Sequence, residues 1–442
     1  MIRRRRSCDC DSGTTIRYAA RRAGIALAAA LMLAVLPACQ SHRATAPRIS
    51  ALTTEPIIRV RVVAGQPNVR ITGPAIVSIG PTPDRTTTVR PRNFHTPLTV
   101  RLDAGRFILR PDRGQALAWA IPELHVQSLE SQTVQVNGTV YPGALWLHRH
   151  VNKQGQPTGR IDAVNHVPLE TYLPGVLERE LYSQWQPQAF AAQAIAARSY
   201  AIATAAQHRD RHYDLEATIA SQMYGGQATN HRAIDAVRQT RGRVLTYHGR
   251  VVFAYYSSCC GGTGQDAVIA FADGVDIPPL RGRPHGHWCT ASKYYRWGPI
   301  RRDARALARR IAAWGREHEH PIARLRGLRR IAITTANAAG RPATFTVTDT
   351  VGRAYKLAAE QFRFACNQEG RGLPPLPPAS QLRSSHVRVR VAGRSVFFTD
   401  GHGYGHGVGL CQHGAQALAQ KGYNAPTILN HYYRGAAIKR AY

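Results

Sequence analysis

Residues 167–200 of this 442-residue chain read VPLETYLPGVLERELYSQWQPQAFAAQAIAARSY. In the first part of this stretch, apolar residues recur at intervals of three and four, which predicts an amphipathic helix over 168–181. Pro174 lies inside that pattern and predicts a kink or a restarted turn. Pro187 is a favourable first residue for a second helix, which the alanine-rich pattern extends to about residue 207. Small side chains on every face of this second helix indicate a central position, against which other elements pack.

The segments on either side of this stretch predict an α+β fold. Alternating apolar and polar residues, interrupted by glycine, proline and aspartate, precede it and are typical of strands. Downstream, the sequence predicts helices over 231–240, 303–314, 358–365 and 412–421, and hairpins that turn at His248-Gly249 and Ala339-Gly340. We divide the chain into a tether (40–56), a β-rich N-terminal part (57–165), a central helical core with hairpins (166–300), an inserted helix-hairpin subdomain (301–370), and C-terminal strands followed by a glycine- and histidine-rich loop and a helix (371–442).

The composition excludes some classes of protein. A hydrophobic content of 44% is ordinary for a globular chain, so neither a disordered nor a polytopic membrane protein is indicated. The net charge is +32, but only five of the 58 basic residues are lysines, and a coding bias could produce this arginine excess. The alternative is attraction to an anionic surface or polymer, such as cell wall, membrane or nucleic acid. No DNA- or RNA-binding motif is present, so we do not expect a nucleic-acid partner.

The N-terminus predicts export. Arginines at positions 3–6 and 17–22 precede an apolar run over 25–38, which is too short for a comfortable membrane span. Residues 1–39 are therefore typical of a signal peptide. The run ends in Leu36-Pro37-Ala38-Cys39, which resembles the end of a bacterial lipoprotein signal and makes Cys39 the lipidated residue. The alternative is an ordinary cleaved signal in which Cys39 has no role. We expect an exported cell-envelope protein that is lipid-anchored to a membrane.

Three segments together resemble the SpoIID/LytB family of stage II sporulation protein D and amidase enhancers. They are VPLETYLPGVLERE with AAQAIAARSYA (167–201), YSSCCGGTG followed by YYRW (256–297), and GHGYGHGVGLCQHGAQALAQKGY with ILNHYYRGAAI (401–438). The segments occur in the family's order, and the resemblance covers nearly the whole mature chain. This resemblance implies an exported protein that acts on peptidoglycan.

The resemblance also implies an activity and its residues. Sporulation members of the family are lytic transglycosylases, which cut glycan strands between N-acetylmuramic acid and N-acetylglucosamine and prefer strands stripped of stem peptides. Their catalytic glutamate matches Glu180, and the arginine of their AAR-S/T-Y motif matches Arg198. Other members enhance a cell-wall amidase, so the alternative is a non-enzymatic, peptidoglycan-binding enhancer of an N-acetylmuramoyl-L-alanine amidase.

A lytic transglycosylase needs one carboxylate rather than the usual two of a hydrolytic glycosidase. Protonated Glu180 would donate a proton to the glycosidic oxygen and then accept one from the sugar's 6-hydroxyl, which leaves a 1,6-anhydro ring. Such a group works best with a pKa near ambient pH, which aromatic neighbours such as Tyr182 and Trp185 could provide. The alternative is a solvated carboxylate at the helix end that pairs with an arginine such as Arg179.

The surrounding motifs suggest binding residues. Arg198 lies in an apolar helix, where an unpaired charge is costly, so it orients Glu180, binds a sugar substituent or locks two helices together. In the glycine- and histidine-rich loop we expect a groove-forming backbone in which His406 and Gln412 bind sugar.

The cysteines leave two alternatives open. Five remain beyond Cys39, and the odd number means that at least one of them is free, bound to metal or paired outside the chain. Cys259, Cys260 and Cys289, with His287, could form a structural zinc site of the kind some family members carry in this region. In an exported protein we favour a disulfide from Cys259 or Cys260 to Cys289, and we expect the chain to require no cofactor. Leu181-Tyr182, Cys411 and His413 depart from the family's usual residues and put its substrate preference in doubt.

Overall fold

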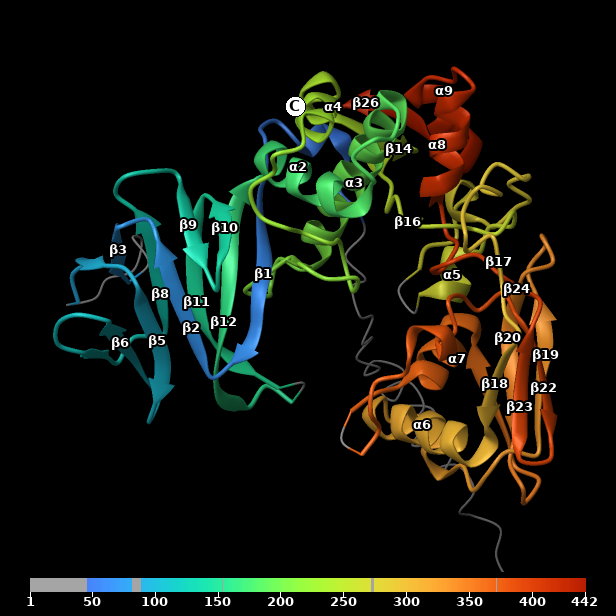
Figure 1. The fold of residues 1–442 in the computed structure, drawn as a ribbon. Helices are drawn as coiled ribbons and strands as arrows, with labels where there is room; N and C mark the ends of the chain where they lie inside the picture. The colour runs from blue at the N-terminus through green and yellow to red at the C-terminus, as the bar shows by residue number, and fades with distance from the viewer. Residues whose placement is uncertain (1–45, 82–88, 153, 272–273, 371) are drawn as a thin grey trace, which may run out of the picture. The chain divides into compact units, whose positions relative to one another are not determined.

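The computed structural model describes residues 46–81, 89–152, 154–271, 274–370 and 372–442 (Figure 1). The predicted signal peptide, the lipidation site at Cys39 and the first residues of the tether lie outside these ranges. Among the helices that are described, none combines the length and apolar character that crossing a membrane requires.

The α+β prediction is confirmed, and the β-rich part consists of two sheets that pack face to face. The seven-stranded sheet has the order β13-β1-β12-β11-β8-β3-β4, and the six-stranded sheet has the order β10-β9-β2-β5-β6-β7. Every second side chain of β2 and β8 is buried, as expected for strands with one face against a core. The first sheet contains β1 (Ile57–Gln66), β3 (Ile76–Gly80), β4 (Arg92–His95), β8 (Glu123–Ser128), β11 (Ala144–Val151), β12 (Pro157–Pro168) and β13 (Leu215–Glu216). The second contains β2 (Asn68–Gly73), β5 (Leu98–Asp103), β6 (Arg106–Pro111), β7 (Leu117–Trp119), β9 (Thr133–Val136) and β10 (Thr139–Pro142).

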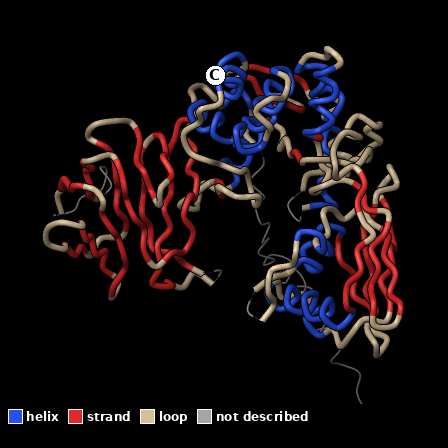
Figure 2. Tube along the Cα trace, in the orientation of Figure 1, coloured by secondary structure: helices blue, strands red, loops and turns tan. Residues whose placement is uncertain are grey.

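A buried helix, α3 (Pro187–Gln207), forms the centre of the helical part (Figures 1 and 2). It begins at Pro187 as predicted, and 15 of its 21 residues are buried. It packs against the other helices because its alanines allow close approach on every face. Its neighbours are α2 (Leu169–Glu180), α4 (His231–Gln239), α8 (Gln412–Gln420), α9 (Ala425–Tyr432) and β14 (Arg243–Tyr247). Helix α2 continues through Pro174 without restarting.

Short strands connect distant parts of the chain to this helical part. The hairpin of β14 and β15 (Arg250–Val251) turns at His248 and Gly249, which both have positive φ, as a two-residue hairpin turn requires. Strand β26 (Ala437–Arg440), which the sequence did not predict, joins β14 from the C-terminus. Two further pairs are β16 (Tyr256–Ser257) with β25 (Leu410–Cys411), and β17 (Arg296–Trp297) with β24 (Gly401–His402). The short helix α5 (Ala267–Ala270) lies between β16 and β17 in the sequence.

A second hydrophobic core spans residues 300–398, so the inserted subdomain extends beyond the predicted boundary at residue 370. The reason is strand pairing, because β18 and β23 are antiparallel neighbours and bury Ile300 and Phe398 in the same core. The elements are β18 (Ile300–Asp303), α6 (Ala304–Glu317), β19 (Arg330–Ala336), β20 (Pro342–Thr348), β21 (Ala354–Ala358), α7 (Ala359–Asn367), β22 (Arg388–Ala392) and β23 (Ser395–Thr399).

A buried ion pair between Arg198 of α3 and Glu170 of α2 fixes the helical part. Arg198 donates from Nε and Nη2 to the two carboxylate oxygens of Glu170, at 2.9 and 2.7 Å. Its side chain is fully buried, and that of Glu170 is 7% exposed. Nη1 also donates to the carbonyl of Arg243 at 3.1 Å, and Glu170 accepts bonds from the N–H of Gly242 and the hydroxyl of Tyr442. The pair therefore joins α2, α3, β14 and the C-terminus.

We expect Arg198→Met to lower the free energy of unfolding by about 3–5 kcal/mol, because it leaves the Glu170 carboxylate buried without its cation. Urea denaturation followed by circular dichroism measures this loss. The double variant Arg198→Met/Glu170→Met removes both charges and should recover part of it. A loss below about 1 kcal/mol for the single variant, the usual value of an exposed pair, would show that the pair does not anchor the helices.

Candidate active site around Glu180

Glu180 is the last residue of α2, and two other segments hold its carboxylate. Oε1 accepts a hydrogen bond from the backbone N–H of Met223, and Oε2 accepts one from Nε2 of Gln412, both at 3.0 Å. The residue is half-buried, whereas Gln412 is only 5% exposed. Within the described residues, no ion pair involves Glu180, so the predicted alternative of a pair with Arg179 is not formed.

This environment favours the protonated form of Glu180. Burial raises the pKa of the carboxyl group above its ordinary value, and the hydrogen bonds from Gln412 and Met223 oppose part of the rise. Burial also raises the pKa of the nearby phenols of Tyr172 and Tyr256. Neither phenol supplies a positive charge that would stabilise the Glu180 carboxylate. A carboxyl group that stays protonated to a higher pH can donate a proton, and its two hydrogen-bond donors can then stabilise the carboxylate.

The three glutamates of α2 have different environments. Burial alone would raise the pKa of Glu170, but Arg198 outweighs burial and lowers it. Glu178 accepts hydrogen bonds from the backbone N–H and the hydroxyl of Thr229, both at 2.9 Å. Glu170 and Glu178 therefore have structural partners, and Glu180 has the raised pKa that suits an acid. This distinction does not depend on family resemblance.

Three aromatic rings lie beside Glu180. The ring of Trp185 is 5.3 Å from that of Tyr182 and 5.1 Å from that of His413, centroid to centroid. Trp185 is buried, whereas Tyr182 is 53% exposed. A surface hollow of about 740 Å³ adjoins the cluster, and Leu181, Tyr182 and Arg232 are among its lining residues. An exposed ring beside a hollow offers an apolar face to a sugar.

The sequence indicated a glycine-containing loop over 221–227 but not that its Met223 bonds Glu180. Residues 221–227 pack on α2 at Gly175, where an added Cβ would lie 2.1 Å from the carbonyl oxygen of Gly226. Gly225 donates its N–H to the carbonyl of Gly175 at 3.3 Å. The glycine inside α2 was the available signal, because a glycine in a helix interior is costly unless another backbone must approach closely.

The structure places the amide of Gln412 on the carboxylate of Glu180, and it does not leave His406 free. Nε2 of His406 lies 2.9 Å from the carbonyl of Tyr256, and Nδ1 accepts from the N–H of Val408 at 3.0 Å. Burial lowers the pKa of His406 to about 4, so the ring is neutral at physiological pH. Nε2 thus holds the glycine- and histidine-rich loop against β16, whereas Nδ1 bonds within the loop, so neither nitrogen is available for a sugar in this conformation.

Arg198 does not lie at this site. Its bidentate partner Glu170 is ten residues before Glu180, or about 15 Å along the helix axis. The sequence left three roles open for Arg198, and its contacts fit the third, in which it locks α2 and α3 together. The expectation that α3 directs Arg198 towards Glu180 is wrong, because the guanidinium is directed to the opposite end of α2.

Four cysteines converge behind the glycine- and histidine-rich loop. The Sγ atoms of Cys259, Cys289 and Cys411 lie within 4.8 Å of one another, and that of Cys260 is 3.7 Å from Sγ of Cys289. All four side chains are buried. Cys411 was not predicted to join them, since it comes close only through the pairing of β16 with β25. His287 is not part of this group, and its Nδ1 lies 2.6 Å from the hydroxyl of Tyr295. Four thiols suit a tetrahedral zinc ion, and export also permits a disulfide.

Comparison with known proteins agrees with the sequence resemblance. The sequence model of the family described as SpoIID, stage II sporulation protein, matches residues 157–247, which include α2, α3 and the loop at Met223. Two curated proteins that match the chain carry the names of the two family branches. The central helical part of the chain thus matches the SpoIID sequence pattern, and the chain is similar to proteins of both branches of the SpoIID/LytB family.

Three curated proteins match well over half of the chain. An uncharacterised protein of Brachyspira hyodysenteriae is 28% identical over 312 residues, which cover 69% of this chain and 73% of the relative. The amidase enhancer of Bacillus subtilis is 28% identical over 294 residues, which cover 60% of this chain but only 40% of the relative. Stage II sporulation protein D of Bacillus amyloliquefaciens is 26% identical over 300 residues, which cover 63% of this chain and 76% of the relative.

Gln412→Met should change the pH dependence of any reaction in which Glu180 acts as the acid. The Gln412 hydrogen bond favours the carboxylate, so its removal raises the pKa of Glu180 further. The falling, high-pH limb of the rate profile should then move to higher pH. Gln416→Met is the matched control, because Gln416 lies one turn later on α8 and accepts from the backbone of Gln186. If the Gln412 and Gln416 variants gave the same profile as the parent, Glu180 would not be the titrating acid.

We expect one disulfide in the cysteine cluster of protein purified without reductant, between Cys260 and Cys289, whose sulfurs lie 3.7 Å apart. Alkylation under denaturing conditions, followed by mass spectrometry, should then label three of the five described cysteines, because the disulfide removes two. Reduction before alkylation should label all five. Five labelled cysteines without reduction, together with stoichiometric zinc in metal analysis, would contradict the disulfide and indicate a metal site.

Proposed function

We propose that this protein is a membrane-anchored lytic transglycosylase that cleaves peptidoglycan glycan strands at the bond from N-acetylmuramic acid to N-acetylglucosamine. The observation that carries the proposal is the state of Glu180, which has a raised pKa, no cationic partner among the described residues and two hydrogen-bond donors on its carboxylate. The match to the SpoIID model and to stage II sporulation protein D supports a role on peptidoglycan, and the lipoprotein-like signal ending at Cys39 supports the anchor.

The reaction requires one residue to act twice. Protonated Glu180 donates its proton to the glycosidic oxygen while the bond to the leaving sugar breaks. The resulting carboxylate is stabilised by the N–H of Met223 and by Gln412. It then accepts the proton of the muramic acid 6-hydroxyl, whose oxygen attacks the anomeric carbon and closes a 1,6-anhydro ring. The enzyme ends in its starting protonation state, and water is not consumed.

The substrate would be held by the surroundings of Glu180. Tyr182 provides an exposed ring, and Arg232 extends along the adjoining hollow, where it donates to the carbonyl of Trp185. We propose glycan stripped of stem peptides as the preferred substrate, as in the sporulation branch of the family.

The decisive test is digestion of peptide-free glycan strands, with mass spectrometry of 1,6-anhydromuramic ends. Glu180→Gln should slow their formation by about 100-fold or more, because general acid and base catalysis is lost. Glu130→Gln is the charge-matched control, because Glu130 is an exposed carboxylate of the β-rich part that accepts a bond from the N–H of Ala75, and its rate should stay close to that of the parent. Equal rates for the parent and Glu180→Gln would refute the mechanism.

The second candidate is a non-enzymatic, peptidoglycan-binding enhancer of an N-acetylmuramoyl-L-alanine amidase. It is favoured by the match to the amidase enhancer of Bacillus subtilis. This function would use the hollow beside Tyr182 but not the proton of Glu180. It would be supported if glycan sedimentation and stimulation of an amidase both survived Glu180→Gln while neither the variant nor the parent formed anhydro ends.

A further inference from the structure

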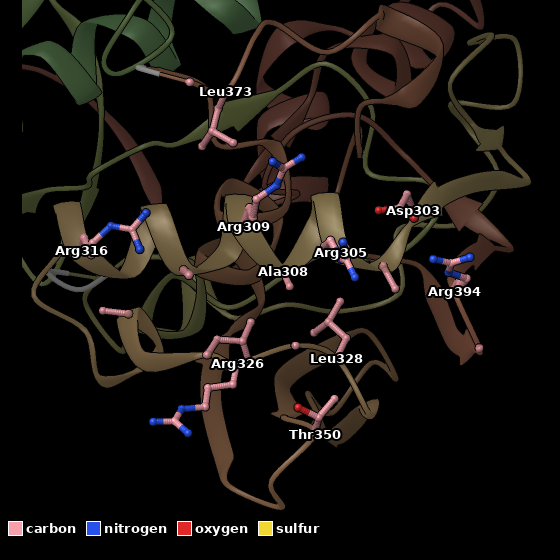
Figure 3. A pocket seen from close by; sticks show the side chains of 17 residues that line it. Asp303, Arg305, Ala308, Arg309, Arg316, Arg326, Leu328, Thr350, Leu373 and Arg394 are labelled. Atoms are coloured by element: carbon pink, nitrogen blue, oxygen red, sulfur yellow. The ribbon is translucent and has the colours of Figure 1, made fainter.

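A large hollow lies in the inserted subdomain, and Glu180 is not among its lining residues. It has a volume of about 880 Å³, and five arginines line it (Figure 3). We call it the arginine groove. Its arginines are Arg305, Arg309, Arg316, Arg326 and Arg394.

Three of these arginines form a stripe along one helix. Arg305, Arg309 and Arg316 are separated by four and seven residues, which places them on the same face of α6. Ala308 and Ala312 lie between them on that face and form part of the floor. Arg326 and Arg394 come from two other segments, so the groove has charged walls on more than one side (Figure 3).

The guanidinium groups of the arginine groove have no partner among the described residues, and all five side chains are exposed. The one carboxylate in the lining, that of Asp303, accepts a bond from the N–H of Ala306 at the start of α6. Arginines on the buried side of the subdomain are different. Arg310 donates to the carbonyls of Gln368 and Pro374, and Arg302 donates to that of Cys366. The groove thus concentrates uncompensated positive charge.

We propose that the arginine groove binds a linear polymer that carries a negative phosphodiester charge in each repeat. Guanidinium groups bind phosphate oxygens in a bidentate manner, and such esters remain charged at any physiological pH. The Cα atoms of Arg305 and Arg316 lie about 16 Å apart along α6, so a ligand must present several charges over that length to reach both. A concave groove with an alanine and leucine floor suits a chain better than the flat surface of a bilayer.

The groove would therefore hold the protein on an anionic envelope polymer while Glu180 acts elsewhere. The binding does not depend on the proposed transglycosylase activity. Accordingly, Glu180→Gln should leave polymer binding unchanged, and removal of the groove's charges should leave cleavage of short, uncharged glycan unchanged.

The test uses fluorescently labelled inorganic polyphosphate, which carries one negative charge for each internal phosphate, and the full mature chain. Fluorescence anisotropy should show that Arg309→Gln/Arg326→Gln weakens binding by about tenfold or more. The dependence of log Kd on log salt should also become shallower, by roughly 0.7 for each phosphate that an arginine no longer neutralises. The matched control is Arg92→Gln/Arg110→Gln, which removes the same charge from exposed arginines of β4 and β6. The control should bind within about twofold of the parent.

Three results would overturn the proposal. If the control weakened binding as much as the groove variant, net charge alone would explain binding. If monophosphate competed as well as polyphosphate at equal phosphate concentration, the groove would hold single anions rather than a chain. If vesicles containing phosphatidylglycerol displaced polyphosphate and the groove variant no longer bound them, while neutral phosphatidylcholine vesicles had no effect, the groove would face a membrane. Because all substituted side chains are exposed, thermal unfolding should match the parent for both variants.

Discussion

The buried pair of Arg198 and Glu170 is the constraint on which the arrangement of the helical part depends. A buried ion pair stabilises a fold only when its geometry and its remaining hydrogen bonds are satisfied. Here the guanidinium is bidentate to the carboxylate and also reaches carbonyls of α4 and the start of β14, and the carboxylate accepts two further bonds. The first turn of α2 is thereby fixed to α3 and the C-terminus. The other end of α2, about 15 Å away, presents Glu180 to Met223 and Gln412.

One helix therefore carries carboxylates with different electrostatic tasks. Glu170 is kept charged by a buried cation, and Glu178 is bonded to Thr229. The carboxyl group of Glu180 is partly buried and has no cation beside it in the described part of the chain. Ionisation of this group is therefore unfavourable, and the protonated form is favoured. Carboxyl groups that are buried without a cation are common in active sites. At such a position a charged partner would make the fold more stable but would remove the raised pKa. The arginine groove, on the surface of the inserted subdomain, also contains charged groups without partners among the described residues.

Local patterns in the sequence predicted much of the fold. Pro187 and the alanine-rich run that follows it predicted both ends of α3, and His248-Gly249 predicted the hairpin turn, because backbone preferences act over a few residues. Helix α9 was overlooked although Asn424 caps it and Pro426 lies in its first turn, so that signal was present. The second hydrophobic core reaches Phe398 because the pairing of β18 with β23 joins residues about 95 positions apart, and local patterns carry no signal for such a pairing.

The site was less predictable, for physical reasons. Sequence spacing could not say whether Arg198 meets Glu170 or Glu180, since both lie on the same helix. The N–H of Met223 is a backbone group and has no sequence signature. Cys411 meets Cys259 and Cys260 only after two short strands pair across some 150 residues. The resemblance identified Glu180, and the structure adds the reason why this glutamate differs from its neighbours.

The most direct measurement is the titration of the glutamate carboxyl carbons by NMR, on protein labelled selectively at glutamate, with the Glu170 and Glu180 signals assigned from their glutamine variants. The account predicts that Glu180 titrates above the ordinary value of 4.5 and that Glu170 titrates below it. A Glu180 carboxyl that titrates at or below the Glu170 value would contradict the claim that the fold prepares Glu180 as an acid.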